Sequence, residues 1–233
     1  MSGILSSNEK LKEKILDQLF WDSRLNAANV QVDVIDKNVV LNGTIPSHKA
    51  RLAAEADAYS VPGVLQVQNN LKIAYSQNHS KHNDDEILKG IVCILMWNPD
   101  IDSSKIIVEV KDGTVLLQGC VGSFWQKKLA KELALDTAGV MDVADNIIVK
   151  PSDNIIDESV ADAIIAALER STFVDAQTVG VKVENGIVTL FGTVCNFTAL
   201  NETITLAAKI VGIVDVINDL KIEPDSSRIY RRP

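Results

Sequence analysis

The sequence predicts an α+β protein built from three tandem αββαβ domains, each a small mixed three-stranded sheet with two helices on one face. The first observation is a motif, VxLxG, that occurs at 39–43, 115–119 and 188–192. The second is another glycine 20 residues after the glycine of each motif. The third is an apolar pattern around the motif that coincides in all three copies without a gap. Self-similarity at a fixed spacing indicates a repeated domain.

The aligned copies set the domain boundaries at residues 8–73, 84–149 and 157–222. The segments between them, 74–83 and 150–156, are short and polar, which is typical of linkers. Residues 223–233 are expected to form a flexible C-terminal tail.

Each domain is predicted to begin with a helix, because apolar residues recur four positions apart and therefore lie along one helix face. They are Leu11, Ile15 and Leu19 in the first domain, Ile87, Ile91 and Leu95 in the second, and Val160, Ile164 and Leu168 in the third. Capping boxes precede two of these helices, formed by Ser6 with Glu9 and by Asn83 with Glu86.

Two strands joined by a tight turn follow this helix. Alternation with a period of two predicts the first strand. Its inward residues are Val30, Val32 and Val34, then Ile106, Val108 and Val110, then Val179, Val181 and Val183. The VxLxG motif forms the second strand. Asp112-Gly113 and Asn185-Gly186 suit the positive φ of a two-residue hairpin turn, whereas Lys37-Asn38 suits it less well.

A second helix and a third strand complete each domain. The expected N-caps of this helix are Ser47, Ser123 and Asn196. Because the helix connects the second strand to the third, these two strands should be parallel, and the sheet is therefore mixed. One polar residue of the third strand shares the inward parity in each copy: Asn69, Asp145 and Asn218. We expect it to satisfy backbone groups, with a ligand role as the alternative.

Six glycines are expected to be structural. Each motif glycine should end a strand where a side chain would collide with the following turn; these are Gly43, Gly119 and Gly192. The later glycines should stop the second helix and adopt positive φ, a conformation that only glycine adopts readily; these are Gly63, Gly139 and Gly212.

The charge of the chain argues against a nucleic-acid partner. With 31 acidic and 23 basic residues, the formal net charge is −8. The first domain has 8 of each sign, while the second has 11 acidic against 6 basic residues and the third 9 against 4. The sequence shows no signal peptide and no apolar stretch of membrane-spanning length, so a cytoplasmic location is expected.

No catalytic motif is evident, since the sequence lacks a Walker A loop, a GxSxG elbow and an HExxH pair. The three cysteines have no CxxC spacing, so neither a disulfide framework nor a zinc site is predicted. His79 and His82 form an HxxH beside Asp84 and Asp85, but they fall in a predicted linker and are interpreted as a solvated stretch rather than a metal site. We therefore expect a protein that is not an enzyme and has no metal or cofactor.

Aromatic residues gather at the helix ends. Trp21 and Trp97 occupy the same position at the end of the first helix, away from its buried stripe, and the third domain has Arg170 there. The opening turn of the second helix carries Phe124, Trp125 and Phe197. These five aromatics are the candidate contacts with a membrane or a partner; the alternative is that they pack over adjacent loops.

The VxLxG strand, the glycine 20 positions on, and the segments GVLQVQNNLKI, GVMDVADNIIV and GIVDVINDLKI resemble the BON (bacterial OsmY and nodulation) domain, in three copies. The resemblance implies an αββαβ fold, a bacterial source and a non-enzymatic role linked to osmotic or envelope stress and to phospholipid membranes. Many members are periplasmic, and some cytosolic members bind potassium.

Three hypotheses for function remain open. One is a stress-related binding protein that associates with phospholipid membranes through apolar helix ends. Another is a self-assembling scaffold, because small sheets leave strand edges that can pair. The last is a cytosolic cation sensor, for which the acidity of the second and third domains is the motive.

Overall fold

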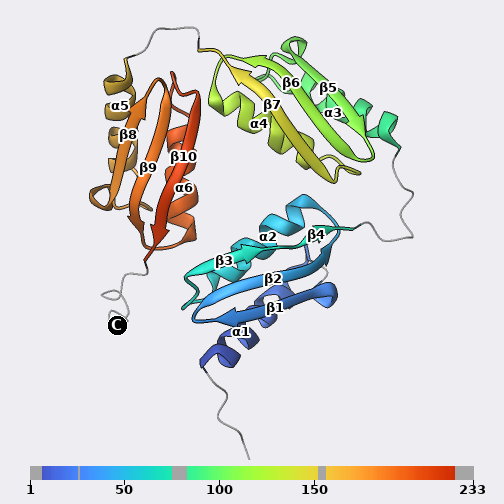
Figure 1. Cartoon of the computed structure of the whole chain (residues 1–233), viewed down its shortest axis with the longest axis vertical. Helices are drawn as coiled ribbons and strands as arrows, with labels where there is room; N and C mark the ends of the chain where they lie inside the picture. Colours follow the sequence, from blue (N-terminus) through green and yellow to red (C-terminus); the bar gives the residue numbers. More distant parts are fainter. Residues whose placement is uncertain (1–6, 26, 75–82, 152–155, 224–233) are drawn as a thin grey trace, which may run out of the picture. The chain divides into compact units, whose positions relative to one another are not determined.

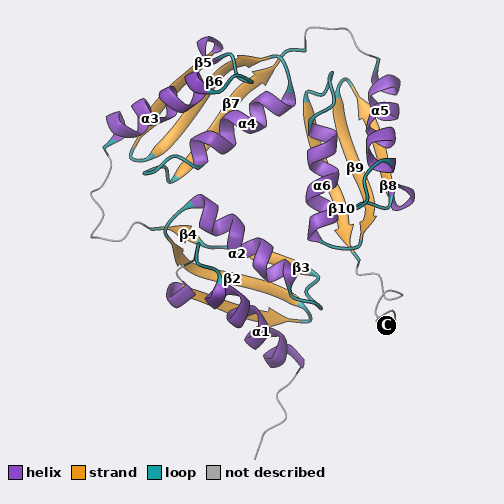
Figure 2. Ribbon diagram, turned by 180° about the vertical axis from the view of Figure 1, so that it is seen from behind, coloured by secondary structure: helices purple, strands orange, loops and turns teal. Residues whose placement is uncertain are grey.

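The computed structural model describes residues 7–25, 27–74, 83–151 and 156–223. The order helix, strand, strand, helix, strand occurs three times, and each copy has its own sheet. In each copy the two helices cover one face of the sheet and leave the other face open (Figures 1 and 2). The predicted α+β fold of three αββαβ units is confirmed.

The first domain consists of α1 (Ser7–Trp21), β1 (Val30–Ile35), β2 (Asn38–Ile45), α2 (His48–Ser60) and a last strand in two pieces, β3 (Gln66–Asn69) and β4 (Lys72–Ile73). A 3₁₀ turn, η1 (Ala27–Asn29), precedes β1. Strand β2 is central: it pairs antiparallel with β1 and parallel with both β3 and β4.

The second domain consists of α3 (Asp84–Trp97), η2 (Ser103–Lys105), β5 (Ile106–Lys111), β6 (Thr114–Val121), α4 (Phe124–Leu135) and β7 (Asp142–Val149). The third consists of α5 (Asp157–Glu169), η3 (Ala176–Thr178), β8 (Val179–Glu184), β9 (Ile187–Val194), α6 (Phe197–Ala208) and β10 (Asp215–Ile222). The motif strands β6 and β9 are the central ones, and β9 pairs parallel with β10 and antiparallel with β8.

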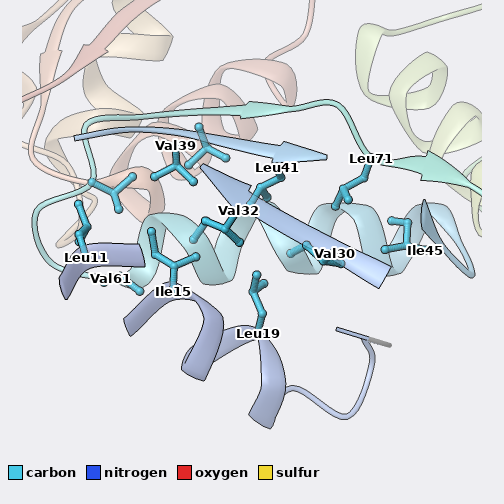
Figure 3. Close-up of a cluster of buried hydrophobic side chains, with 14 of the residues drawn as sticks. Leu11, Ile15, Leu19, Val30, Val32, Val39, Leu41, Ile45, Val61 and Leu71 are labelled. Atoms are coloured by element: carbon cyan, nitrogen blue, oxygen red, sulfur yellow. The ribbon is translucent and has the colours of Figure 1, made fainter. Parts of the chain in front are cut away.

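The core of each domain lies between the helices and the sheet. The nine helical residues predicted to lie on the inner stripes are all buried. In the first domain, Leu11, Ile15 and Leu19 project from α1 toward Val32 and Leu41 of the sheet (Figure 3). The buried members of this cluster all fall between residues 11 and 71, so the first domain has a core of its own.

The hairpin turn of the first domain differs from the prediction. Asp112-Gly113 and Asn185-Gly186 form their turns with positive φ at both residues, as expected. In the first domain the residues with positive φ are Asp36 and Lys37, at 47° and 67°, rather than Lys37 and Asn38. Asn38 instead begins β2 and pairs with Ile35. The turn type is retained there without glycine.

The predicted collision of the motif glycines with the turn that follows their strand is wrong. Gly43, Gly119 and Gly192 lie inside the central strand, two residues before its end, with φ between 111° and 125°. A Cβ at these positions would overlap the backbone carbonyl oxygen of the last residue of η1, η2 or η3. The collision is therefore with the turn that precedes the first strand, because β1, β5 and β8 start directly opposite the glycine.

The later glycines and the caps behave largely as predicted. Positive φ is confirmed at Gly63, Gly139 and Gly212, although each lies three or four residues beyond the helix and belongs to the turn before the last strand. The second helices are capped by Ser47, Ser123 and Asn196, whose side chains accept a hydrogen bond from the backbone N–H three residues on. Asn83 and Glu86 form the predicted capping box, while Ser6 lies outside the described residues.

The polar residues predicted on the inner side of the last strand satisfy backbone groups, although Asn218 is exposed. Asn69, Asp145 and Asn218 each accept a hydrogen bond through Oδ1 from the backbone N–H two residues on. Asn69 also donates to the carbonyl oxygen of Arg51 and to Glu55 on α2. Asn69 is the last residue of β3, so these two bonds to α2 lie next to the interruption between β3 and β4. Among the described strands, only the last strand of the first domain is interrupted.

Candidate membrane or partner interface

The second domain brings three of the predicted aromatic residues to one end. Trp97 is the last residue of α3 and is 77% exposed. Phe124 and Trp125 open α4, held by the Ser123 cap. The Gln126 side chain donates a hydrogen bond of 2.8 Å to the carbonyl oxygen of Asp100, which ties the loop after α3 to the first turn of α4. We refer to Trp97, Phe124 and Trp125 as the aromatic end of domain 2.

The outer side of α3 extends this apolar surface. Beyond the buried stripe, the last two turns expose Val92, Ile94, Met96 and Trp97. The acidic residues of the helix are confined to its first turn, at Asp84, Asp85 and Glu86. A helix that is apolar on nearly all sides is ordinarily buried. The C-terminal half of α3 therefore presents an apolar surface that the described part of the domain does not cover.

The first domain exposes a pair of aromatic residues. Trp21, at the end of α1, is 76% exposed, and Phe20 beside it is 70% exposed. The two rings pack edge to face, with centroids 5.5 Å apart and an interplanar angle of 85°. Phe20 was not among the predicted contact residues. Its position next to Trp21 and outside the buried stripe was sufficient to predict its exposure.

The third domain departs from the other two. Phe197 lies in the first turn of α6 as predicted and is partly exposed. Arg170 takes the place of the tryptophan, and the exposed aromatic of this end is instead Phe173, in the loop after α5. Phe173 lines a cavity of about 420 Å³ together with Asp175, Thr178 and Cys195. This cavity was not predictable from the sequence, because its walls come from segments far apart in the chain.

One cluster of charged groups in the first domain combines two largely buried carboxyl side chains with an exposed guanidinium. Arg24 binds Asp22 through Nε and Nη2, and the Asp22 side chain is only 10% exposed. Asp57 on α2 is 9% exposed. Burial, followed by the neighbouring Asp22, raises the pKa of Asp57 to about 6. Hydrogen bonds from Arg24 hold the pKa of Asp22 well below its usual range.

The described residues contain neither a metal-binding cluster nor a helix that could span a membrane. Within residues 7–25, 27–74, 83–151 and 156–223, no group of three or more His, Cys, Asp or Glu side chains is arranged to hold a metal ion. His79 and His82 lie outside these ranges. Over the same part of the chain, no helix has the length and apolar character required to cross a bilayer.

The three-fold arrangement agrees with a family comparison. The model of the BON domain matches residues 7–75, 83–151 and 156–224. The chain belongs to the BON domain family. Each match includes one αββαβ unit, so the three copies seen in the sequence are three BON domains.

Comparison with curated proteins gives no significant match. Among solved structures, the chain is similar to CdsD, a structural protein of the type III secretion system of Chlamydia trachomatis, at 18% identity and a TM-score of 0.28, covering 96% of this chain and 99% of that one. The C-terminal domain of the same protein matches at 18% identity and a TM-score of 0.27, covering 96% of this chain and 100% of that one. TM-scores this low support no inference about function.

Proposed function

We propose that this BON-domain protein is a non-enzymatic bacterial binding protein that associates with phospholipid membranes through the aromatic end of domain 2. The observation that carries the proposal is the exposure of Trp97 beside an apolar helix surface at the end of the domain that also holds Phe124 and Trp125. Trp21, with Phe20, is a second contact from domain 1. The family resemblance extends the proposal to osmotic or envelope stress.

Apolar insertion is the mechanism that the charges favour. The second and third domains are acidic, so anionic headgroups repel them. Tryptophan gains free energy at a membrane interface because its ring is apolar and its N–H can still reach water. Transferring one such side chain contributes about 2 kcal/mol, by the area removed from water. Binding should therefore be weakened little by salt, which screens charges but not apolar burial.

Flotation with liposomes tests this function. The intact chain should float with liposomes at both low and high ionic strength, and the double variant Trp97→Ala, Trp125→Ala should float at least tenfold less. Phe191→Ala is a matched control, because it removes an exposed aromatic from the open face of the sheet in domain 3. Absence of flotation by the intact chain, or equal flotation of the double variant, would contradict the proposal.

Self-assembly is the second candidate. Each sheet leaves an outer edge on its first strand, β1, β5 or β8, where backbone groups can pair with another chain. The open face of the second sheet also exposes Ile107 and Ile148. Sedimentation velocity at rising concentration distinguishes the candidates: a scaffold should form species of higher mass without lipid, whereas the membrane proposal requires none.

A further inference from the structure

Domain 1 contains a buried carboxyl group that the other domains lack. Asp57 lies on the inner side of α2, and its Oδ2 has no hydrogen-bond partner among the residues that the structure describes. The aligned positions of the other two domains hold Leu133 and Leu206, both partly buried. An acidic side chain therefore replaces an apolar one where the second helix packs against the first.

The groups that face Asp57 come from α1 and from the turn that follows it. Gln18 on α1 and the carboxyl of Asp22 lie close enough to Asp57 to shift its pKa, Gln18 lowering it and Asp22 raising it. Arg24 is directed to Asp22, to which it donates from Nε at 3.0 and 2.9 Å. The guanidinium therefore bonds to Asp22, and no bond from Arg24 reaches the carboxyl of Asp57.

The remaining charged groups nearby do not neutralise Asp57. Lys14 and Asp17 of α1 line a shallow groove near the end of α2, together with Ser60 and Pro62. On α2 itself, Glu55 accepts a hydrogen bond from Asn69 of the sheet. If both Asp22 and Asp57 were ionised, the cluster would keep one uncompensated negative charge in a largely buried position, which is costly.

We propose that Asp57 is protonated and donates a hydrogen bond to the carboxylate of Asp22. The contact between α1 and α2 in domain 1 is then a pH-sensitive latch. It is closed while Asp57 is protonated and is weakened when the proton is lost. Domains 2 and 3 have leucine at this position and no such latch. The device is therefore specific to the first BON domain of the chain.

The direction of the pH effect follows from the two carboxyl groups. The pKa of Asp57 is raised to about 6, above the value of about 3.9 for an unfolded aspartate, so its contribution to stability is complete below about pH 4 and is lost as the pH rises through 6. The pKa of Asp22 is lowered, so that group stays ionised in the folded domain and contributes little change above about pH 5. Domain 1 should consequently loosen progressively from about pH 4 to about pH 7.

Hydrogen exchange of the full chain at pH 5 and pH 7.5, corrected for the intrinsic rates, tests the latch. Peptides from α1 and α2 should lose at least threefold in protection at the higher pH, while peptides from α4 and α6 should not change. In Asp57→Asn, which keeps the shape but cannot ionise, the protection of α1 and α2 should be the same at both pH values. Asp33→Asn is the matched control: it removes an exposed ion pair with Lys12 of α1, which contributes little to stability, and it should keep the native pH response.

Carboxyl resonances supply a readout that does not depend on a variant folding well. The carboxyl carbon of Asp57 should titrate with a midpoint at least about one pH unit above 3.9, the ordinary value of an aspartate. The proposal is overturned if Asp57 titrates as an ordinary aspartate, if α1 and α2 are equally protected at both pH values in the native chain, or if Asp57→Asn retains the native pH response.

Discussion

At the residue scale, the motif glycine is the feature on which each domain depends most directly. Gly43, Gly119 and Gly192 combine a positive φ with a backbone carbonyl oxygen placed where a side chain would begin. The repeat in the sequence showed that glycine was required at this position. It could not show which neighbour required it, because the opposing residue comes from a turn earlier in the chain, whose register is set only when β1, β5 or β8 pairs.

We predict that Gly119→Ala lowers the stability of the second domain by at least about 2 kcal/mol, because a non-glycine residue at such a φ costs about 1–3 kcal/mol and the Lys105 carbonyl must also move. Gly122→Ala is the control. Its φ is not positive and the nearest atom to an added Cβ is 3.6 Å away, so it should change stability by less than about 0.5 kcal/mol. Hydrogen exchange of the β6 amides in the full chain measures both. Equal effects of the two substitutions would show that the glycine is not constrained by this carbonyl.

At the element scale, an aspartate at the start of the first helix binds the hairpin turn in the second and third domains. We call this contact the aspartate clip; it was not predicted from the sequence. In the third domain, the Asp157 carboxylate at the start of α5 accepts hydrogen bonds from the backbone N–H groups of Asn185 and Gly186, at 2.7 and 2.9 Å. Asp84 makes the same pair of bonds to Asp112 and Gly113, at 2.8 and 3.0 Å. The aligned residue of the first domain is Asn8.

Removing the clip should loosen the hairpin turn. Asp157→Ala is expected to cost about 1–2 kcal/mol, since the two bonds are made to a charged acceptor near a helix N-terminus. Asp162→Ala, in the next turn of α5 and exposed, removes a carboxylate without these bonds and should cost little. Exchange rates of the Asn185 and Gly186 amides, followed by NMR, compare the two. Unchanged protection in Asp157→Ala would contradict the role of the clip.

The elements themselves were largely predictable, because their signals are local. The four-residue spacing of Leu11, Ile15 and Leu19, and its counterparts, placed the buried face of each first helix correctly. The turn of domain 1 was misplaced by one residue because Asp36-Lys37 lacks the glycine that marks the other two turns. The clip was missed because it joins residues 28 and 29 positions apart. The break between β3 and β4 was also missed; it follows Asn69, whose side chain bonds to Arg51 and Glu55 of α2.

At the scale of the whole molecule, three domains of one fold present different surfaces. Domain 2 has the apolar C-terminal half of α3, domain 1 has Phe20 and Trp21, and domain 3 has Arg170 at the equivalent position. The sequence identified the tryptophans because they lie off the buried stripe. It did not identify Phe173 or the unshared carboxyl of Asp57, whose environments depend on tertiary packing.

We predict that the second domain folds alone. Residues 84–149 carry a complete αββαβ unit, with the inner stripe of α3 and the buried residues of β6 and β7. A chain of this length buries a modest core, so its unfolding should be cooperative but of low stability, a few kcal/mol by the usual scaling of small domains. Circular dichroism during urea titration provides the measurement. A fragment without cooperative unfolding would show that neighbouring domains are required.

Quenching by brominated lipids tests whether Trp97 enters the membrane. The chain has three tryptophans, so a variant with Trp21→Phe and Trp125→Phe leaves Trp97 as the only one. With vesicles carrying bromine on the acyl chains, the emission of Trp97 should shift to shorter wavelength and be quenched, at both low and high salt. Emission that stays at the wavelength of an exposed indole and is not quenched, while the protein remains folded, would contradict the account.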